Sequence, residues 1–299
     1  MPTALLCLTP ATNIVQSPRT PDSTRGLMRH TPMQLLGFWS LRLATAALLA
    51  CLPAAAKAQR PDVVYEPTPQ ETVTRMLNLA RVSASDFVID LGSGDGRIPI
   101  AAGRNGARAL GVELDDKLLE KARSAAQSAG VAGRVSFRKE DLFRTPLDDA
   151  TVITLYLLPE LNVRLRPRLL SLRPGTRVVS HQFPMGDWRP DTVDDNGGRI
   201  YLWIVPANVA GRWQIRNGDQ RFTVDLRQQY QEISGTATLA GGTQSLRDAR
   251  LRGNDIEFSI DLGGRVTRFR GTVAGDAMQS AAGTVSFEQT AGAWQASRQ

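Results

Sequence analysis

VIDLGSGDGR, residues 88–97, places an apolar run directly ahead of three glycines and a helix-like segment. Glycine loses more conformational freedom on folding than any other residue, so this density indicates a tight turn or a close approach by a neighbouring group. In a doubly wound sheet, the turn after the first strand lies at the carboxyl edge, where ligands bind. The stretch therefore predicts a buried strand followed by a ligand-binding turn.

Strand-like apolar runs alternate with amphipathic segments on both sides of this turn. The strand-like runs are 87–91, 107–114, 135–141, 151–158, 176–183 and 199–206, and the helical runs are 68–82, 97–105, 116–130 and 159–174. Thr68, followed by Pro69 and by Glu71, has the spacing of a capping box at the start of the first helix. Buried strands separated by helices predict an α/β fold with a parallel, doubly wound, Rossmann-like sheet.

The pattern changes after Pro206, where apolar and polar residues alternate with a period of two. Phe222, Val224 and Leu226 show this alternation, and the pair Gly263-Gly264 has the composition of a hairpin turn. We predict a small all-β antiparallel barrel or sandwich, with Trp213 and Trp294 filling its interior. The expected domains are a leader over 1–58, an α/β domain over 59–206 and a β-rich domain over 207–299.

The leader has the form of a signal peptide or membrane anchor. Arg29 and Arg42 precede the apolar run LATAALLACLPAAAKAQ, residues 43–59, which holds small residues around Lys57. We therefore expect an exported protein, periplasmic or anchored in an inner membrane, with membrane association through the leader. Cleavage by a signal peptidase and retention as an anchor are both compatible with the sequence.

Composition excludes several classes of chemistry. Cys7 and Cys51 are the only cysteines, and His181 is the only histidine after residue 58. The chain beyond the leader can therefore form no disulfide and no thiolate metal site, and no metal is expected. The net charge is +7, but no basic run interleaved with aromatic residues is present, so no nucleic-acid partner is expected.

Two ligand classes could occupy the glycine turn. A dinucleotide fingerprint, G-x-G-x-x-G, fits Gly92 and Gly94, but Arg97 stands where the third glycine belongs. Asp90 lies two residues before the first glycine, and its carboxylate would repel a pyrophosphate. An acid at this position suits a cationic ligand that carries an amino group and a sulfonium.

This pattern resembles motif I of the class I S-adenosylmethionine-dependent methyltransferases, and the resemblance extends over residues 65–205. It implies S-adenosyl-L-methionine as cofactor, a ribose-binding role for Glu113 and a place near the adenine for Asp141. The cofactor-binding residues that the resemblance implies are Tyr65, Asp90, Gly92, Ser93, Gly94, Gly96, Glu113, Asp141 and Leu142. A carboxylate on the ribose also occurs in NAD enzymes, so Glu113 alone discriminates little.

Four segments show a narrower resemblance, namely YEPTP (65–69), DLGSGDGRI (90–98), YLLPELN (156–162) and RPGTRVVSHQF (173–183). They are similar to the seven-strand lysine methyltransferases that modify mitochondrial translocase and ATP-synthase subunits, and to their bacterial relatives. The resemblance implies transfer of a methyl group to a protein lysine, with Tyr65 closing over the cofactor. It does not cover the leader or the β-rich domain.

YLLPELN follows the fourth strand, where the transferred methyl group emerges in this fold, and it departs from the polar-Pro motif of amino-group methyltransferases. Tyr156, Pro159 and Asn162 are the catalytic candidates there. Two other functions stay open: methylation of a small molecule or lipid precursor, and non-catalytic binding on a decayed methyltransferase fold. His181 is a further candidate base.

Overall fold

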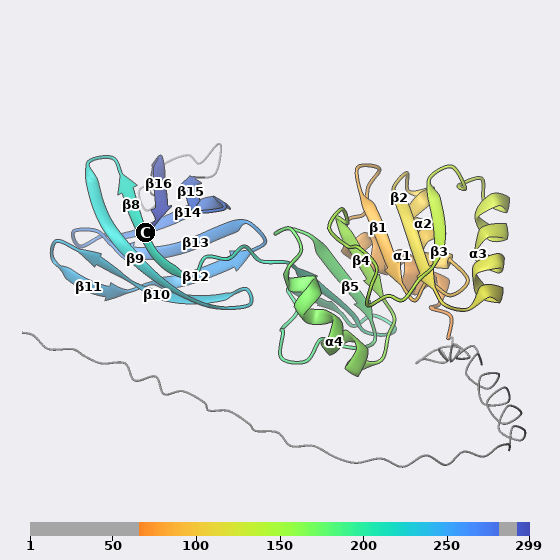
Figure 1. Ribbon diagram of the computed structural model, residues 1–299. Coiled ribbons are helices and arrows are strands. Elements are labelled where there is room, and N and C mark those ends of the chain that lie inside the picture. Colours follow the sequence, from red (N-terminus) through yellow and green to blue (C-terminus); the bar gives the residue numbers. More distant parts are fainter. Residues whose placement is uncertain (1–65, 281–291) are drawn as a thin grey trace, which may run out of the picture. The chain divides into compact units, whose positions relative to one another are not determined.

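The structure is a computed structural model that describes residues 66–280 and 292–299 (Figure 1). The leader and Tyr65 lie outside the described residues. Within the described ranges, no helix is long and apolar enough to cross a membrane. Each of the two sheets is built from consecutive elements, the first ending at Ile204 and the second beginning at Gly211.

The first sheet has seven strands in the order β3-β2-β1-β4-β5-β7-β6. Its strands are β1 (Phe87–Leu91), β2 (Arg108–Glu113), β3 (Val135–Lys139), β4 (Val152–Leu155), β5 (Arg177–His181), β6 (Thr192–Asp194) and β7 (Ile200–Ile204). The first five are parallel, which confirms the α/β, Rossmann-like class. The last two depart from the fully parallel sheet that the sequence predicts, because β7 pairs antiparallel with both β5 and β6.

Four helices accompany this sheet: α1 (Gln70–Leu79), α2 (Arg97–Arg104), α3 (Asp116–Ser128) and α4 (Pro159–Leu170). The first three contribute apolar side chains to one core, and α4 contributes Leu165 and Leu169 to a second core. The predicted capping box is wrong: Pro69 is the N-cap of α1, and no side chain caps the helix. Thr68 is buried, and its carbonyl accepts a hydrogen bond from Arg97 Nη1 at 2.6 Å.

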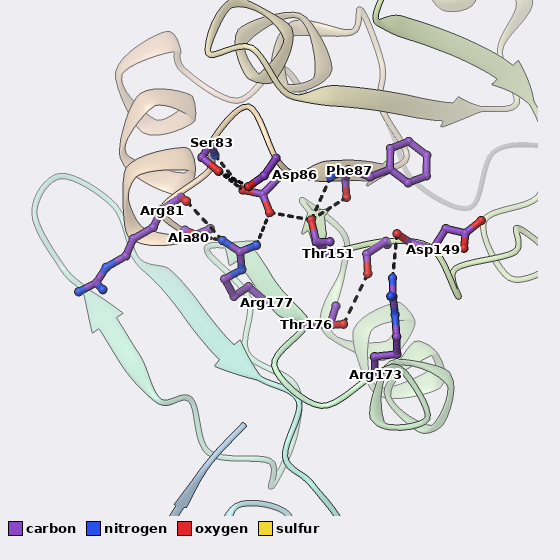
Figure 2. A network of polar contacts seen from close by, with 12 residues as sticks. Ala80, Arg81, Ser83, Asp86, Phe87, Asp149, Thr151, Arg173, Thr176 and Arg177 are labelled. Carbon is purple, nitrogen blue, oxygen red and sulfur yellow. Dashed lines mark hydrogen bonds and ion pairs between the residues drawn. The ribbon is translucent and has the colours of Figure 1, made fainter. Parts of the chain in front are cut away.

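A polar network ties the amino ends of the central strands together (Figure 2). Asp86, which precedes β1, is buried and forms an ion pair with Arg177 at the start of β5. Asp86 also accepts hydrogen bonds from Ser83 N at 2.8 Å and from Thr151 Oγ1 at 2.8 Å. Arg177 Nη1 donates to the carbonyl of Ala80 at 2.8 Å, so the end of α1 joins the same network. The edge opposite the glycine turn is therefore fixed by charge-assisted hydrogen bonds.

The second sheet has nine antiparallel strands in the order β11-β10-β9-β8-β16-β15-β14-β13-β12. Its strands are β8 (Gly211–Asn217), β9 (Gln220–Gln229), β10 (Glu232–Leu239), β11 (Gly242–Ser245), β12 (Arg247–Arg252), β13 (Asp255–Asp261), β14 (Val266–Ala274), β15 (Ala277–Ser280) and β16 (Trp294–Arg298). The Gln244 amide exchanges two hydrogen bonds of 2.8 Å with the backbone of Asp261, so the two ends of the sheet approach each other. The result is a nearly closed barrel, as the sequence predicts.

The apolar residues that alternate along the second sheet face its core, as the sequence predicts. Phe222, Val224 and Leu226 are buried in one core with Trp213 and Trp294. The Gly263-Gly264 turn joins β13 to β14, which confirms the predicted hairpin. Independent folding of 59–206 and 207–299 stays a prediction.

Candidate active site

The glycine turn has a left-handed backbone, with φ of +80° at Gly92, +52° at Gly94 and +79° at Gly96. A side chain at Gly96 would also collide with Phe137, whose Cζ lies 2.6 Å from the position of a Cβ. Phe137 is on β3, so this glycine is required for packing of the turn against its own domain. The close approach that the sequence predicts is therefore made in part by the protein itself.

A cavity with a volume of ≈ 380 Å³ lies beside this turn. Its carboxyl-bearing lining residues are Glu66, Asp90, Asp95, Glu113, Asp115, Glu140 and Asp141. Among the described lining residues Arg97 is the one basic side chain, and it pairs with Asp95 at 2.8 Å. An acidic cavity of this kind attracts a positively charged ligand.

Asp90, at the carboxyl half of β1, is the most buried of these acids. It is 2% exposed, and its Oδ1 accepts a 2.6 Å hydrogen bond from Thr154 Oγ1 on β4. Burial raises its pKa to about 7; the Thr154 hydrogen bond opposes this, and the nearby charges of Glu113 and Asp95 add to it. A cation in the cavity would stabilise the ionised form.

Glu113, the last residue of β2, accepts hydrogen bonds from the backbone of the glycine turn and from the backbone that follows β2. Its Oε2 accepts from Gly94 N at 3.0 Å, and its Oε1 accepts from Leu114 N at 2.7 Å and from Asp115 N at 3.1 Å. A carboxylate has about four lone-pair sites, so the three backbone hydrogen bonds leave capacity for one ligand hydroxyl. Glu113 therefore both shapes the glycine turn and faces the cavity.

The other predicted cofactor residues divide into two groups. Ser93, Asp141, Leu142 and Gly92 line the cavity, and Asp141 Oδ1 also accepts from Phe143 N at 2.9 Å. Gly94 and Gly96 are not among its described lining residues, and they act through the shape of the turn. Tyr65 lies outside the described residues.

Of the three catalytic candidates, Tyr156 alone is among the described residues that line the cavity. Tyr156 lines the cavity, and its hydroxyl donates to Gln182 Oε1 at 3.3 Å. Pro159 is the first residue of α4 and does not line the described part of the cavity.

The third candidate, Asn162, is fully buried away from the cavity lining. Its Nδ2 donates to Ser180 Oγ at 3.3 Å and to the carbonyl of Phe183 at 3.2 Å. Asn162 thus anchors the turn after β5. Its Oδ1 is buried without a hydrogen-bond partner among the described residues, and its role at the acceptor site stays a prediction.

Sequence reasoning missed four acids in the lining, namely Glu66, Asp95, Asp115 and Glu140. Glu66 lies in the YEPTP segment beside the singled-out Tyr65, and Glu140 lies beside Asp141, so neighbouring positions in both motifs carried the signal. His181, considered as a base, is 6% exposed at the end of β5, and its ring centroid lies 4.3 Å from that of Tyr156.

S-adenosylmethionine fits the residues present. Its sulfonium and ammonium match the acidic lining, and two buried polar atoms of that lining, Ser93 Oγ and Glu140 Oε2, have no hydrogen-bond partner among the described residues. The strand order, the glycine turn and the carboxylates near the ends of β1, β2 and β3 define a class I, S-adenosylmethionine-dependent methyltransferase.

Comparison with known proteins agrees with this class. Residues 90–192 match the family model described as the ANTKMT methyltransferase domain. A protein-lysine N-methyltransferase of Saccharolobus islandicus (strain REY15A) is 43% identical over 153 residues, which are 48% of this chain and 95% of that protein. The chain therefore belongs to this family of methyltransferases, and the resemblance drawn from the sequence is confirmed.

Two further similarities have different extents. The adenine nucleotide translocase lysine N-methyltransferase of Mus musculus is 37% identical over 149 residues, which are 49% of this chain and 65% of that protein. A crystal structure described as an RNA methyltransferase from Salinibacter ruber in complex with S-adenosyl-L-homocysteine is 52% identical, with a TM-score of 0.47. It covers 48% of this chain and 96% of that chain.

Proposed function

We propose that this enzyme transfers a methyl group to the ε-amino group of a lysine in a protein substrate. The observation that carries the proposal is the match to the archaeal protein-lysine N-methyltransferase, which extends over 95% of that protein at 43% identity. The acidic cavity supports it, because an acceptor that arrives as an ammonium is attracted by the same carboxylates as the cofactor.

The chemistry asks little of acid–base groups. When bound, S-adenosylmethionine supplies an electrophilic methyl group on a positively charged sulfonium, and its thioether product leaves without protonation. The protein must align the acceptor amine and keep it unprotonated, and alignment alone can contribute about 7–11 kcal/mol to lowering the barrier. A lysine has an ordinary pKa of about 10.4, which a neighbouring cation lowers by disfavouring the ammonium. No strong base is needed.

A methyl-transfer assay tests the proposal. The full-length protein is incubated with S-adenosylmethionine that carries a labelled methyl group and with three acceptors: poly-L-lysine, a mixture of lysine-rich proteins, and n-butylamine. We expect label in protein lysines, identified as methyl-lysine after acid hydrolysis. Label in n-butylamine alone would favour the rival function, methylation of a small amine or lipid precursor.

We also propose that residues 1–58 direct the chain to a membrane or across it. The basic residues and the apolar run before Gln59 support this location. Mass spectrometry of the native N-terminus combined with cell fractionation tests it. A full-length chain recovered only from the cytosol would contradict export. Export would also require the cofactor, which is made in the cytosol, to reach the enzyme.

A further inference from the structure

The mouth of the cavity carries an acid that neither the glycine motif nor the strand ends explain. Glu66 is exposed, lines the cavity and precedes α1. Tyr156, which directly follows β4, lines the same cavity, and its hydroxyl donates its one proton to Gln182 Oε1 at 3.3 Å. Burial, followed by the nearby charge of Glu66, raises the pKa of Tyr156, so the phenol stays protonated. The Glu66 carboxylate thus lies close to the end of the strand where the methyl group emerges.

Gln182, which directly follows β5 and contacts Tyr156, has a strained backbone. Its φ of +66° is a left-handed conformation that is uncommon for residues other than glycine. Its backbone N–H donates to the carbonyl of Arg199 at 2.7 Å, and its Oε1 accepts from the Tyr156 hydroxyl. Such strain persists where the surrounding structure fixes it, and it concentrates at functional sites.

Aromatic rings surround the same position. Phe183 stacks on Tyr156 with ring centroids 6.2 Å apart. The His181 ring also contacts Tyr156, with ring centroids 4.3 Å apart. His181 is 6% exposed, and its Nδ1 has no partner among the described residues. Burial lowers the pKa of His181, which keeps the imidazole neutral, while the charges of Glu66 and Arg75 act on it in opposite directions. A carboxylate beside aromatic faces is a setting in which alkylammonium groups bind.

We propose that Glu66, which lines the cavity together with Tyr156, binds the ammonium group of the methyl acceptor. This inference rests on the proposed function and extends it by naming the residue that recognises the acceptor. Glu66 is a substrate-binding residue, and Tyr156 is an aromatic neighbour of the same site.

The reaction balances without any further reagent. The acceptor ammonium loses one proton to water, which the exposed position of Glu66 permits. The amine lone pair then forms the new N–C bond while the S–C bond of the sulfonium breaks, and the bonding pair passes to sulfur. The products are an N-methylammonium group, which carries the positive charge that the sulfonium has lost, and a neutral thioether.

Steady-state kinetics of the full-length Glu66→Gln variant with poly-L-lysine tests the inference. We expect the KM for poly-L-lysine to rise at least about tenfold, because the ion pair with the ammonium is lost. The dissociation constant for S-adenosylmethionine should stay within about threefold, as measured by calorimetry. Glu66→Asp keeps the charge and should recover most of the affinity, while Glu120→Gln, an exposed acid on α3, is the matched control.

A binding measurement separates failure of this inference from failure of the lysine proposal. n-Butylammonium is titrated into wild-type protein and into Glu66→Gln, both saturated with S-adenosylhomocysteine. Weaker binding to the variant supports the inference even if poly-L-lysine is not methylated, in which case the acceptor is a small amine. Equal KM values for poly-L-lysine, or equal n-butylammonium affinities, in wild type and variant would overturn it.

Discussion

Glu113 has two roles in the structure, a predicted contact with the ribose and a contact with the backbone of its own domain. Sequence reasoning assigns it to the ribose, but its carboxylate also accepts three backbone N–H groups, from Gly94, Leu114 and Asp115. A hydrogen bond to a charged group contributes about 1.5–3 kcal/mol when buried, and the partial exposure of Glu113 reduces this. Loss of the carboxylate should therefore affect both the fold and the cofactor.

We expect Glu113→Ala to lower the free energy of unfolding by about 1–3 kcal/mol. The same variant should weaken S-adenosylmethionine binding by about 10- to 150-fold, equivalent to about 1.5–3 kcal/mol for the loss of one hydrogen bond to a charged group. Calorimetric titration and thermal unfolding measure the two effects, with Glu120→Ala as control. The ribose contact is isolated by comparing S-adenosylhomocysteine with its 2′-deoxy analogue. If removal of the 2′-hydroxyl weakens binding by the same factor in wild type and variant, Glu113 does not bind that hydroxyl.

Asp90 makes stability depend on pH. Its pKa is raised from 3.8 to about 7 in the folded chain, mainly by burial, so the folded state holds a proton that the unfolded state has lost between these values. Stability should fall as pH rises from about 4 to about 7 and remain lower above that. Asp90→Asn keeps an acceptor for Thr154 and removes the buried charge. At pH 8 it should raise the free energy of unfolding by about 2–4 kcal/mol, since one pKa unit is about 1.4 kcal/mol.

The cofactor reverses this preference. A sulfonium beside Asp90 favours its ionised form, so wild-type affinity for S-adenosylmethionine should decrease as pH falls below about 7. Asp90→Asn should bind more weakly at pH 8 and show little pH dependence. Chemical denaturation and calorimetry at pH 5 and pH 8 check both expectations. A variant that is less stable than wild type at pH 8 would show that the carboxylate is needed in the apo fold.

At the scale of elements, Asp86 connects the end of α1 to the starts of β1, β4 and β5 (Figure 2). Burial alone would raise the pKa of Asp86, but hydrogen bonds from Ser83 N, Thr151 and Arg177 outweigh it and hold the pKa below 3.8. Its stabilising contribution is therefore present above pH 4 and is lost as pH falls through the lowered pKa.

We expect Asp86→Ala to lower the free energy of unfolding at pH 7 by about 2–4 kcal/mol, because removing one partner leaves the Arg177 guanidinium uncompensated. The difference from wild type should shrink as the pH is lowered to 2. Denaturant unfolding at several pH values measures it, with the exposed Asp148→Ala as control. A loss equal to that of the control would mean that the network contributes no net stability.

Elements with a clear local signal, such as an apolar run or a helical periodicity, could be predicted from the sequence. Elements that depend on contacts between distant residues could not. The strand ahead of Gly92 is apolar at every position except Asp90, and its place in the chain follows from local sequence alone. β6 has three residues, none of them buried, so its pairing with β7 leaves no periodic signal. The capping box failed because Thr68 is buried and its carbonyl binds Arg97, a contact between residues far apart in the chain.

The candidate active site divides in the same way. Asp90, Glu113 and Asp141 were predictable because a motif and a strand end coincide at each. Glu66 was not, because its place beside Tyr156 depends on how the segment before α1 meets the end of β4. For Asn162 the motif position suggests a substrate contact, which stays a prediction; the hydrogen bond from its amide to the carbonyl of Phe183 could not be predicted, because it joins residues far apart in the chain.

At the scale of the whole molecule, the segment between the two sheets belongs to the second one. The Ala207 N–H donates to the carbonyl of Gly253 at 2.8 Å, and the Val209 N–H donates to Gln228 Oε1 at 2.7 Å. The carbonyl of Val209 accepts from Trp213 Nε1 at 2.8 Å, and both Ala207 and Val209 are buried in the core of the second sheet. A boundary before Ala207 keeps these contacts intact.

We predict that a fragment of residues 207–299 folds on its own. It has an apolar core of its own, and the two ends of its sheet are joined by hydrogen bonds. A fragment of residues 212–299 loses Val209 and the partner of Trp213, and it should be less stable by about 2–4 kcal/mol, as for removal of a buried aliphatic side chain and one hydrogen bond. Urea unfolding followed by tryptophan fluorescence compares the two. If 207–299 shows no cooperative transition, the second sheet depends on the first for folding. Equal midpoints would place the boundary after Gly211 instead.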